Sequence, residues 1–529
     1  MSRGVQAHGG GYAASLLLAV SLVFPAAHAQ ADERSAATPR AALEHGLRPS
    51  VLKPGQASPG WSLRERMAHY RVPGVAIGIL KQGEVVYAEG FGLREADTQD
   101  AVDADTLFNV GSISKVVTAA TSLRLVADGK LDLDNDVGAY LKTWRIPSAP
   151  GVAHPVVTLR MLMSHTSGLG VHGFPDFLPG EAVPTLRQSL DGTFPARNDP
   201  VRLQRTPGMV GDYSGGGTTV EQLVIEEVSG VPLENVARAQ VFAPLGMRRS
   251  TFESPLSASR GNIAKAHNDE GERVALPRGW QTFPQEAAAG LWTSANELGT
   301  FVGALIRSYQ GTQPFLPQAL ATQMMSEVAP SWHGLGPRLD GAGNARIFHH
   351  GGANDSYHAW IEGYLQTGDG FVILTNGENG WQLHTEIRNA LSDAFGHGVN
   401  PPVRVVALAP EAVRLADYAG VYRVDNAVPV DLRRAFTDIF PDVESIKIKV
   451  DEGKMSVVLP DETGGLLALA PMRFIAPSVF GTEYSFQRDA HGVVRGVTVA
   501  YGEARAYFSR QAPPAQPHGR AAESAVAIE

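Results

Sequence analysis

Ser112 and Lys115 are the residues whose types and spacing suggest chemistry, in the segment VGSISKVVTAA at 110–120. On a helix, positions three apart lie on one face, so the serine hydroxyl and the lysine amine can meet across a single turn. A serine hydroxyl becomes a good nucleophile only when a neighbouring base takes its proton, and a lysine held in an apolar helix face can be that base. The pair therefore predicts a nucleophilic serine.

An ordinary helix would also explain these two residues. Ser112 can cap the helix, and Lys115 can extend from it to the solvent. Ser-x-x-Lys is short enough to recur by chance in most large proteins, so the motif alone does not decide. If Ser112 lies at a helix N-terminus, the backbone N–H groups there are directed at an anionic intermediate beside it. The surrounding sequence has to separate the two interpretations.

The segment TLFNVGSISKVVTAATSLRLVADGKLDLDNDV at 106–137 closely resembles the active-serine region of the β-lactamase-related serine hydrolases. That group includes class C β-lactamases, D-Ala-D-Ala carboxypeptidases, D-aminopeptidases and esterases of β-lactamase fold. The segments 157–169, 241–252 and 349–376 resemble the same family. Since the resemblance extends from about Val72 to Asn376, it is far more specific than Ser-x-x-Lys alone. It implies an acyl-transferring hydrolase.

The resemblance gives roles to the residues of the first two motifs. It implies that Ser112 is the nucleophile and Lys115 its proton acceptor or electrostatic helper. The family's second motif is Tyr-x-Asn, and Tyr213, Ser214 and Gly215 stand at its place. The resemblance therefore implies that Tyr213 is the tyrosine that passes the proton to the leaving group. A phenol can do so only if a neighbouring cation stabilises its ionised form, and Lys115 is the available cation. Which of Lys115 and Tyr213 is the acylation base stays open.

The third motif of the family is Lys, His or Trp, then a small residue, then glycine. His350 opens a match to it, and its glycines let a strand edge lie close to a substrate. By the resemblance, the N–H groups of Ala353 and Ser112 form the oxyanion hole. His349 and His350 are adjacent on a strand and point to opposite faces, and the resemblance implies that His349 is structural. The implied substrate-binding residues are His350, Gly351, Gly352 and Gly215.

Gly215 is the departure from the family pattern. Hydrolases of lactam antibiotics usually hold asparagine there, whose amide binds the substrate's acylamino group and the lysine. The glycine therefore argues against a true β-lactamase and favours an esterase or a D-amino-acid peptidase. A rival from another class is a non-catalytic receptor for penicillin or cell-wall peptides. Gly215 favours this receptor, whereas the complete set of Ser112, Lys115 and Tyr213 argues against it.

Other chemistries lack their patterns. His154, His165 and His172 have no metal-ligand spacing, and there is neither a cysteine nor a His-Glu-x-x-His segment, so we expect no metal and no cofactor. His165, in the turn SHTSGL, is interpreted as structural by the resemblance. The glycines at 215–217 lack the lysine of a phosphate loop, and no Gly-x-Ser-x-Gly elbow surrounds Ser112, which argues against an α/β-hydrolase.

Charge and composition limit the partners. The 529 residues include 45 basic and 54 acidic ones, a net charge of -9, with no long run of either sign. We therefore expect no nucleic acid as partner, but a small-molecule ester, a D-amino-acid peptide or a cell-wall peptide. With no cysteine, the chain has no disulfide, no thiol nucleophile and no lipid-carrying cysteine.

The N-terminus is typical of an exported protein. Arg3 precedes an apolar run at 12–24, and Ala27-His28-Ala29 fits signal cleavage before Gln30. An uncleaved membrane anchor needs about twenty apolar residues, which this run lacks. We expect a mature protein without a membrane anchor, in the periplasm or outside the cell.

The periodicity predicts an α+β fold, in which an antiparallel sheet from both ends of the catalytic region is flanked by helices, followed by an all-β barrel-like domain. Hairpin strands are expected in 72–80 and 84–92, strands in 345–353, 356–365 and 368–377, and helices in 114–125, 158–169, 218–230 and 294–306, the last with a possible capping box of Ser294 and Glu297. The expected divisions are a signal peptide at 1–29, a flexible lead-in at 30–60, a catalytic domain at 61–400, a linker at 401–412, an all-β accessory domain at 413–510 and a disordered tail at 511–529.

Overall fold

The structure is a computed structural model. It describes residues 39–53, 55–148, 151–152, 156–406, 408, 412–425, 443–459, 463–477, 481–501 and 504–511. The expected signal peptide and all but the first residue of the expected tail lie outside the described residues, as does His154.

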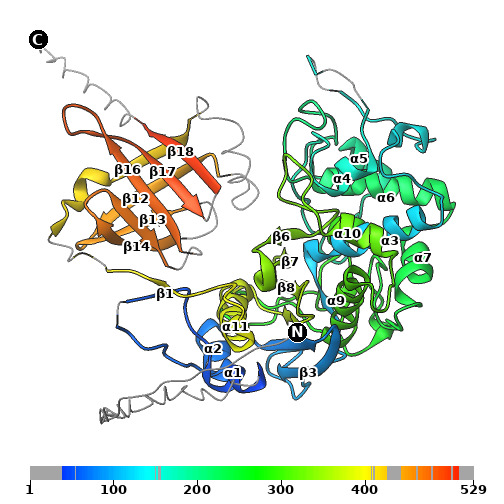
Figure 1. Cartoon of the computed structure of the whole chain (residues 1–529), viewed down its shortest axis with the longest axis horizontal. Coiled ribbons are helices and arrows are strands. Elements are labelled where there is room, and N and C mark those ends of the chain that lie inside the picture. Colours follow the sequence, from blue (N-terminus) through cyan, green and yellow to red (C-terminus); the bar gives the residue numbers. More distant parts are fainter. Residues whose placement is uncertain are drawn as a thin grey trace, which may run out of the picture. The chain divides into compact units, whose positions relative to one another are not determined.

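An antiparallel sheet of six strands is the frame of the catalytic part (Figure 1). Its order is β3-β2-β9-β8-β7-β6, so the first hairpin pairs with a strand almost three hundred residues later, Val75 opposite Thr375. This confirms the expected sheet built from both ends of the region. The strands are β2 (Gly74–Lys81), β3 (Glu84–Gly92), β6 (Arg338–Asp340), β7 (Ile347–Asn354), β8 (Tyr357–Tyr364) and β9 (Gly370–Thr375).

Helices cover both faces of the sheet, and alternate strand residues supply two separate cores. Ile77 and Ile373 pack with α1, α2 and α11, whereas their neighbours Ala76 and Leu374 pack with α3, α6 and α9. The described helices are α1 (Pro39–His45), α2 (Leu63–Tyr70), α3 (Ser114–Ala127), α4 (Leu159–Met163), α5 (Leu186–Asp191), α6 (Gly215–Ser229), α7 (Leu233–Ala237), α8 (Glu286–Ala289), α9 (Ala295–Gln310), α10 (Gln318–Met324) and α11 (Gly380–Phe395).

The helices α4 and α9 differ in detail from the prediction. The pattern at 158–169 predicts a longer helix than α4, which ends at Met163 because the chain turns there and His165 adopts a positive φ of 58°. At α9, Ser294 accepts a hydrogen bond from the N–H of Glu297, but the Glu297 carboxylate binds the N–H groups of Arg249 and Ser250 instead. The predicted capping box is therefore only half formed.

The lead-in predicted at 30–60 is wrong for its described part. Leu43 of α1 is buried against the sheet, and Arg48 is buried in an ion pair with Asp393 of α11. The strand β1 (Val51–Leu52) pairs with β10 (Val403–Arg404), which lies within the expected linker. The segment has only a few apolar residues among many alanines and prolines, so its sequence shows no apolar periodicity from which a helix could be predicted.

The C-terminal part is a closed barrel of eight antiparallel strands, which confirms the barrel-like domain. Along β12, buried and exposed residues alternate, as a barrel with a filled interior requires. Strand β14 has a weak strand signal in its own sequence, because its segment LLALA consists of strong helix formers. The strands are β11 (Gly420–Val424), β12 (Ser445–Asp451), β13 (Lys454–Val458), β14 (Thr463–Ala470), β15 (Arg473–Ala476), β16 (Thr482–Arg488), β17 (Val494–Tyr501) and β18 (Ala504–Arg510).

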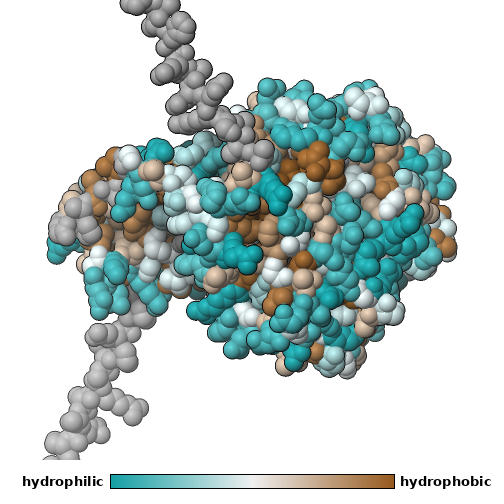
Figure 2. All heavy atoms as spheres, turned by 90° about the horizontal axis from the view of Figure 1, so that it is seen from below, coloured by the Kyte–Doolittle hydropathy of each residue, from teal (hydrophilic) through white to brown (hydrophobic). Residues whose placement is uncertain are grey.

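The surface is mixed in character. On the face drawn in Figure 2, hydrophilic side chains predominate and hydrophobic ones form small separate patches. Within the described ranges, no helix combines the length and the apolar character that crossing a membrane requires.

Candidate active site

Ser112 lies in a 3-10 turn, Gly111–Ile113, immediately before α3. The Lys115 side chain is buried, and its Nζ lies 3.1 Å from Ser112 Oγ and 2.8 Å from the carbonyl oxygen of Ala288. The alternative of a capping serine and a solvent-reaching lysine is therefore wrong, since no side chain caps α3. The helix brings together the two groups that the spacing predicted would meet.

Helix α8 holds Lys115 in place. Its carbonyl groups point at α3, where Ala288 accepts from Lys115 and Ala287 accepts from Thr118 Oγ1 at 3.0 Å. Sequence reasoning missed this helix, because 173 residues separate Lys115 from Ala288 and no local pattern joins them.

Tyr213 stands on the other side of the lysine, with Lys115 Nζ 5.0 Å from the centre of its ring. His165 fixes the backbone on both sides of the tyrosine: its carbonyl accepts from the N–H of Asp212 at 2.8 Å, and its Nδ1 accepts from the N–H of Ser214 at 3.2 Å. The two rings lie 4.3 Å apart. His165 is thus structural, as predicted, and its task is to position Tyr213.

Strand β7 passes very close to the turn that carries Ser112. A Cβ at Gly352 would lie 1.9 Å from the carbonyl oxygen of Val110 and 3.2 Å from the nitrogen of Ser112, and a Cβ at Gly111 would lie 2.6 Å from the nitrogen of Ala353. The backbone nitrogens of Ser112 and Ala353 are therefore neighbours, as an oxyanion hole requires.

Asn109 locks this arrangement and was missed from the sequence. Its buried side-chain oxygen accepts from the N–H of Gly111 at 2.9 Å and from the side-chain amide of Asn354, and its amide donates to Ala289 of α8 at 3.3 Å. One side chain thus joins the nucleophile turn, the end of β7 and α8.

Replacing Gly352 with alanine should therefore disable the site. The new methyl group would displace β7 from Ser112, and a shift of about 1 Å can cost about 100-fold in rate. Overpacking should also lower stability by roughly 1–3 kcal/mol. We would measure kcat/KM and the thermal midpoint. Gly351→Ala is the control, because the nearest atoms to its Cβ belong to the Trp360 ring at 3.3 Å, on the opposite face of β7 from Ser112. Equal activity in both variants would contradict this geometry.

The two histidines of the third motif face opposite sides of β7. The His349 ring stacks on Trp360 at 5.0 Å, on the side of α11, and is structural in this sense. The His350 ring lies on the side of Ser112, 6.3 Å from the ring of Tyr213.

A family model described as Beta-lactamase matches residues 62–394. The chain belongs to the beta-lactamase family. The resemblance found in the sequence is thereby confirmed, and this membership places the chain among serine hydrolases of beta-lactamase fold.

Relatives in the family have different activities. The chain is 30% identical over 313 residues to Esterase EstB of Burkholderia gladioli, which covers 53% of this chain and 75% of that protein. It is 25% identical over 287 residues to a D-aminopeptidase of Brucella anthropi, covering 54% and 52%. The octameric penicillin-binding protein homologue from Pyrococcus abyssi has a TM-score of 0.52 at 21% identity, covering 84% and 98%. This last likeness shows the fold alone.

At Gly215, which stands at the position of the family's asparagine, neighbouring residues occupy the space that a side chain would need. The N–H of Gly215 donates to the carbonyl of His172 at 3.0 Å, and a Cβ on Gly215 would lie 2.8 Å from that oxygen and 3.2 Å from the Phe174 ring. Because the loop at 171–178 packs so closely, it leaves no room for a side chain at Gly215.

The same loop reaches the far end of β7 through Asp176. Burial, then the nearby Asp355 carboxylate, raises the pKa of Asp176 to about 8, although the N–H of Asp355 and the charge of Arg197 oppose this. The protonated carboxyl of Asp176 thus sits beside the turn that follows Ala353 at neutral pH.

Asp176→Asn should raise the thermal midpoint at pH 8. The pKa of an unfolded aspartate is about 3.9, so between about pH 4 and pH 8 the folded chain binds one more proton than the unfolded chain, and stability falls as pH rises. Asparagine keeps an oxygen for the N–H of Asp355 and does not ionise. We expect a gain of roughly 2 °C or more at pH 8, which should vanish near pH 4. The exposed Asp199→Asn should show no such trend; a gain independent of pH would contradict the assignment.

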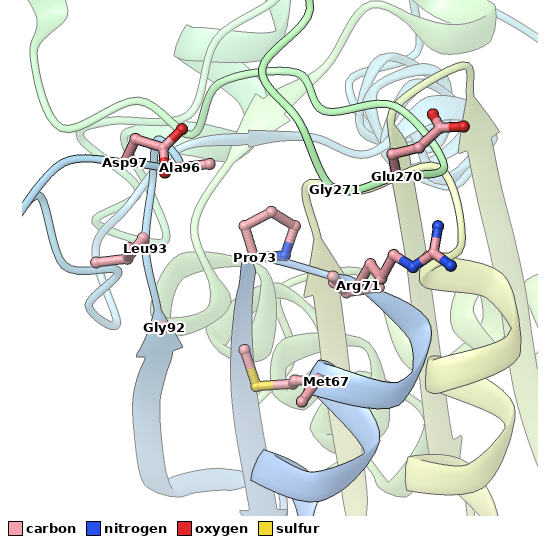
Figure 3. Close-up of a pocket in the computed structure, with 11 residues that line it drawn as sticks. Met67, Arg71, Pro73, Gly92, Leu93, Ala96, Asp97, Glu270 and Gly271 are labelled. Atoms are coloured by element: carbon pink, nitrogen blue, oxygen red, sulfur yellow. The ribbon is translucent and has the colours of Figure 1, made fainter.

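A separate pocket lies at the N-terminal end of β2 (Figure 3). Met67 and Arg71 enter it from the end of α2, Leu93 from the end of β3, and Glu270 from an opposing loop. No residue of the candidate active site lines it. Nor do the described residues include a group of three His, Cys, Asp or Glu side chains that could hold a metal ion.

Proposed function

We propose that the protein hydrolyses an ester or amide of a small molecule or peptide through an acyl-enzyme on Ser112, as an esterase or a D-amino-acid peptidase does. The contact of 3.1 Å between Lys115 Nζ and Ser112 Oγ carries the proposal. The relatives support both arms, since EstB is an esterase and the protein of Brucella anthropi a D-aminopeptidase.

The contacts around Ser112 support the following reaction. Ser112 Oγ attacks the carbonyl carbon while its proton passes to Lys115 or to Tyr213. The carbonyl oxygen takes up negative charge, which the N–H groups of Ser112 and Ala353 stabilise. The C–O or C–N bond then breaks as the leaving group receives the proton through Tyr213, and water hydrolyses the acyl-serine.

Covalent labelling tests the proposal. Intact-mass spectrometry after incubation with a fluorophosphonate, and separately with a penicillin, should be combined with turnover of a p-nitrophenyl ester and a D-alanyl amide. Labelling of Ser112 with ester turnover and no stable penicillin adduct would support an esterase. A penicillin adduct or release of D-alanine would support a peptidase. If neither reagent forms an adduct, Ser112 is not activated, and a non-catalytic receptor replaces the hydrolase as the proposed function.

We further propose that the chain is exported, because residues 1–29 combine an apolar run with the Ala27-His28-Ala29 cleavage pattern. N-terminal sequencing of the protein recovered from a periplasmic fraction should begin at Gln30. Recovery only in the cytoplasm, with an intact N-terminus, would contradict export.

A further inference from the structure

The His350 imidazole is buried on the Ser112 side of β7 and has one hydrogen-bonding atom without a partner among the described residues. The residue is only 1% exposed. Its Nδ1 lies 2.6 Å from the carbonyl oxygen of Gly351. Because a carbonyl oxygen can only accept, Nδ1 carries the proton of this hydrogen bond, and in the neutral ring Nε2 then holds a lone pair.

The lone pair of Nε2 has no donor. Nε2 is buried, and the described part of the chain offers it no hydrogen-bond partner. Buried acceptors without donors are rare in native proteins, and other described histidines, His349 among them, also have an unpartnered ring nitrogen. The position of His350 sets it apart: Gly352, two positions along the same face of β7, packs against the turn of Ser112, and the His350 ring lies 6.3 Å from the ring of Tyr213. We therefore look to the substrate for the missing donor.

The surroundings keep the ring neutral. Burial first, and then the charges of Arg338, His333 and Lys115, hold the pKa of His350 well below its usual range. These groups come from β6, from the loop before it and from α3, and the ring of Tyr213 faces His350 as well. Together they oppose a second proton on the imidazole.

We propose that His350 is a specificity-determining residue whose Nε2 accepts a hydrogen bond from an N–H or O–H group of the substrate, so that the active site prefers a neutral donor there to a carboxylate. This inference rests on the proposed function and narrows its substrate class to uncharged amides or alcohols at that position. A carboxylate has only acceptor atoms, so its lone pairs would repel the lone pair of Nε2 unless the buried ring took up a proton.

Matched substrate pairs test the preference. On the acyl side, p-nitrophenyl succinamate is compared with p-nitrophenyl succinate, and on the leaving-group side 3-carbamoylphenyl acetate with 3-carboxyphenyl acetate. In the wild type, kcat/KM at pH 7 should favour the amide member of at least one pair by about 10-fold or more. The attraction of Arg338 and Lys115 for anions is the same in every variant, so it cancels when the ratios are compared.

Three variants assign the preference to Nε2. His350→Gln keeps an accepting oxygen and should keep the amide preference, whereas His350→Lys offers only donors and should reverse it. His349→Gln, on the opposite face of β7, should leave the ratio unchanged. Equal or carboxylate-favouring ratios in the wild type, or a ratio that His350→Lys does not move, would overturn the proposal.

A separate readout distinguishes failure of the proposal from failure of the proposed function. If wild-type Ser112 takes no fluorophosphonate label, the hydrolase proposal fails by itself. His350 is then tested by ¹⁵N NMR of histidine-labelled protein, with its signals assigned from their loss in His350→Gln. We expect an unprotonated Nε2 at pH 6–8 that responds to added acetamide more than to acetate. A protonated Nε2 at pH 7 would overturn the proposal.

Discussion

Ser112→Ala should reduce kcat/KM by at least about 10⁴-fold while the protein still folds, because removing a nucleophile leaves only the binding and oxyanion contributions. Ser112 precedes α3 and the contact of its Oγ is with Lys115 Nζ, so loss of the hydroxyl leaves the packing of α3 intact. Turnover of a p-nitrophenyl ester and the thermal midpoint are the measurements. Activity retained within about 10-fold would exclude Ser112 as the nucleophile.

Ser114→Ala is the matched control for this variant. Ser114 is buried, donates to the carbonyl of Gly111 at 2.6 Å and accepts from the N–H of Leu291 at 3.0 Å. Its loss leaves a buried N–H without an acceptor, which should cost roughly 1–3 kcal/mol. The variant should therefore unfold at a lower temperature yet still take the fluorophosphonate label at Ser112. Ser112→Ala should therefore lower activity without lowering stability, and Ser114→Ala should lower stability without preventing the labelling of Ser112.

Lys115→Met should lower kcat/KM by about 10²–10⁴-fold, the range expected for loss of a proton acceptor. Methionine fills the buried space of the lysine stem but offers neither charge nor donor. The carbonyl of Ala288 loses its partner as well, so some loss of stability accompanies the loss of rate. The rate of fluorophosphonate labelling reports the nucleophilicity of Ser112 directly and should fall with kcat/KM.

Thr118→Val distinguishes the catalytic loss from the structural one. Thr118 lies nearly one turn further along α3, and its hydroxyl donates to the carbonyl of Ala287, the neighbour of Ala288. This hydrogen bond does not involve Ser112. The isosteric valine should reproduce the loss of an α3–α8 hydrogen bond and leave labelling of Ser112 near the wild-type rate. If Thr118→Val slows labelling as much as Lys115→Met, the lysine acts through packing and not as a base.

Contacts that follow from local periodicity could be predicted, and contacts that depend on distant packing could not. The meeting of Ser112 and Lys115 follows from helix geometry, and the opposite directions of His349 and His350 follow from strand geometry. The carbonyl of Ala288 reaches Lys115 only because α8 packs on α3, and no spacing in the sequence encodes that approach.

Weak local signals explain the remaining differences. The sequence around Leu43 has too few apolar residues for a periodicity, although the sheet buries that leucine. Strand β14 consists largely of leucine, alanine and glycine, residues that favour a helix or no regular structure, and only its partners β13 and β15 make it a strand. At Gly215 the sequence shows that the asparagine of the family pattern is absent, but not that Phe174 and His172 pack into the space.

The pairing of β2 with β9 also sets an order of events during synthesis. Val75 leaves the ribosome three hundred residues before its partner Thr375, so the first hairpin waits with one apolar edge uncovered. Ser112 likewise waits for Ala288 and Ala353, which supply the lysine's acceptor and the second backbone donor. We therefore expect a nascent chain that ends before Ala353 to carry an unreactive Ser112, because the second backbone donor of the proposed oxyanion hole is still missing.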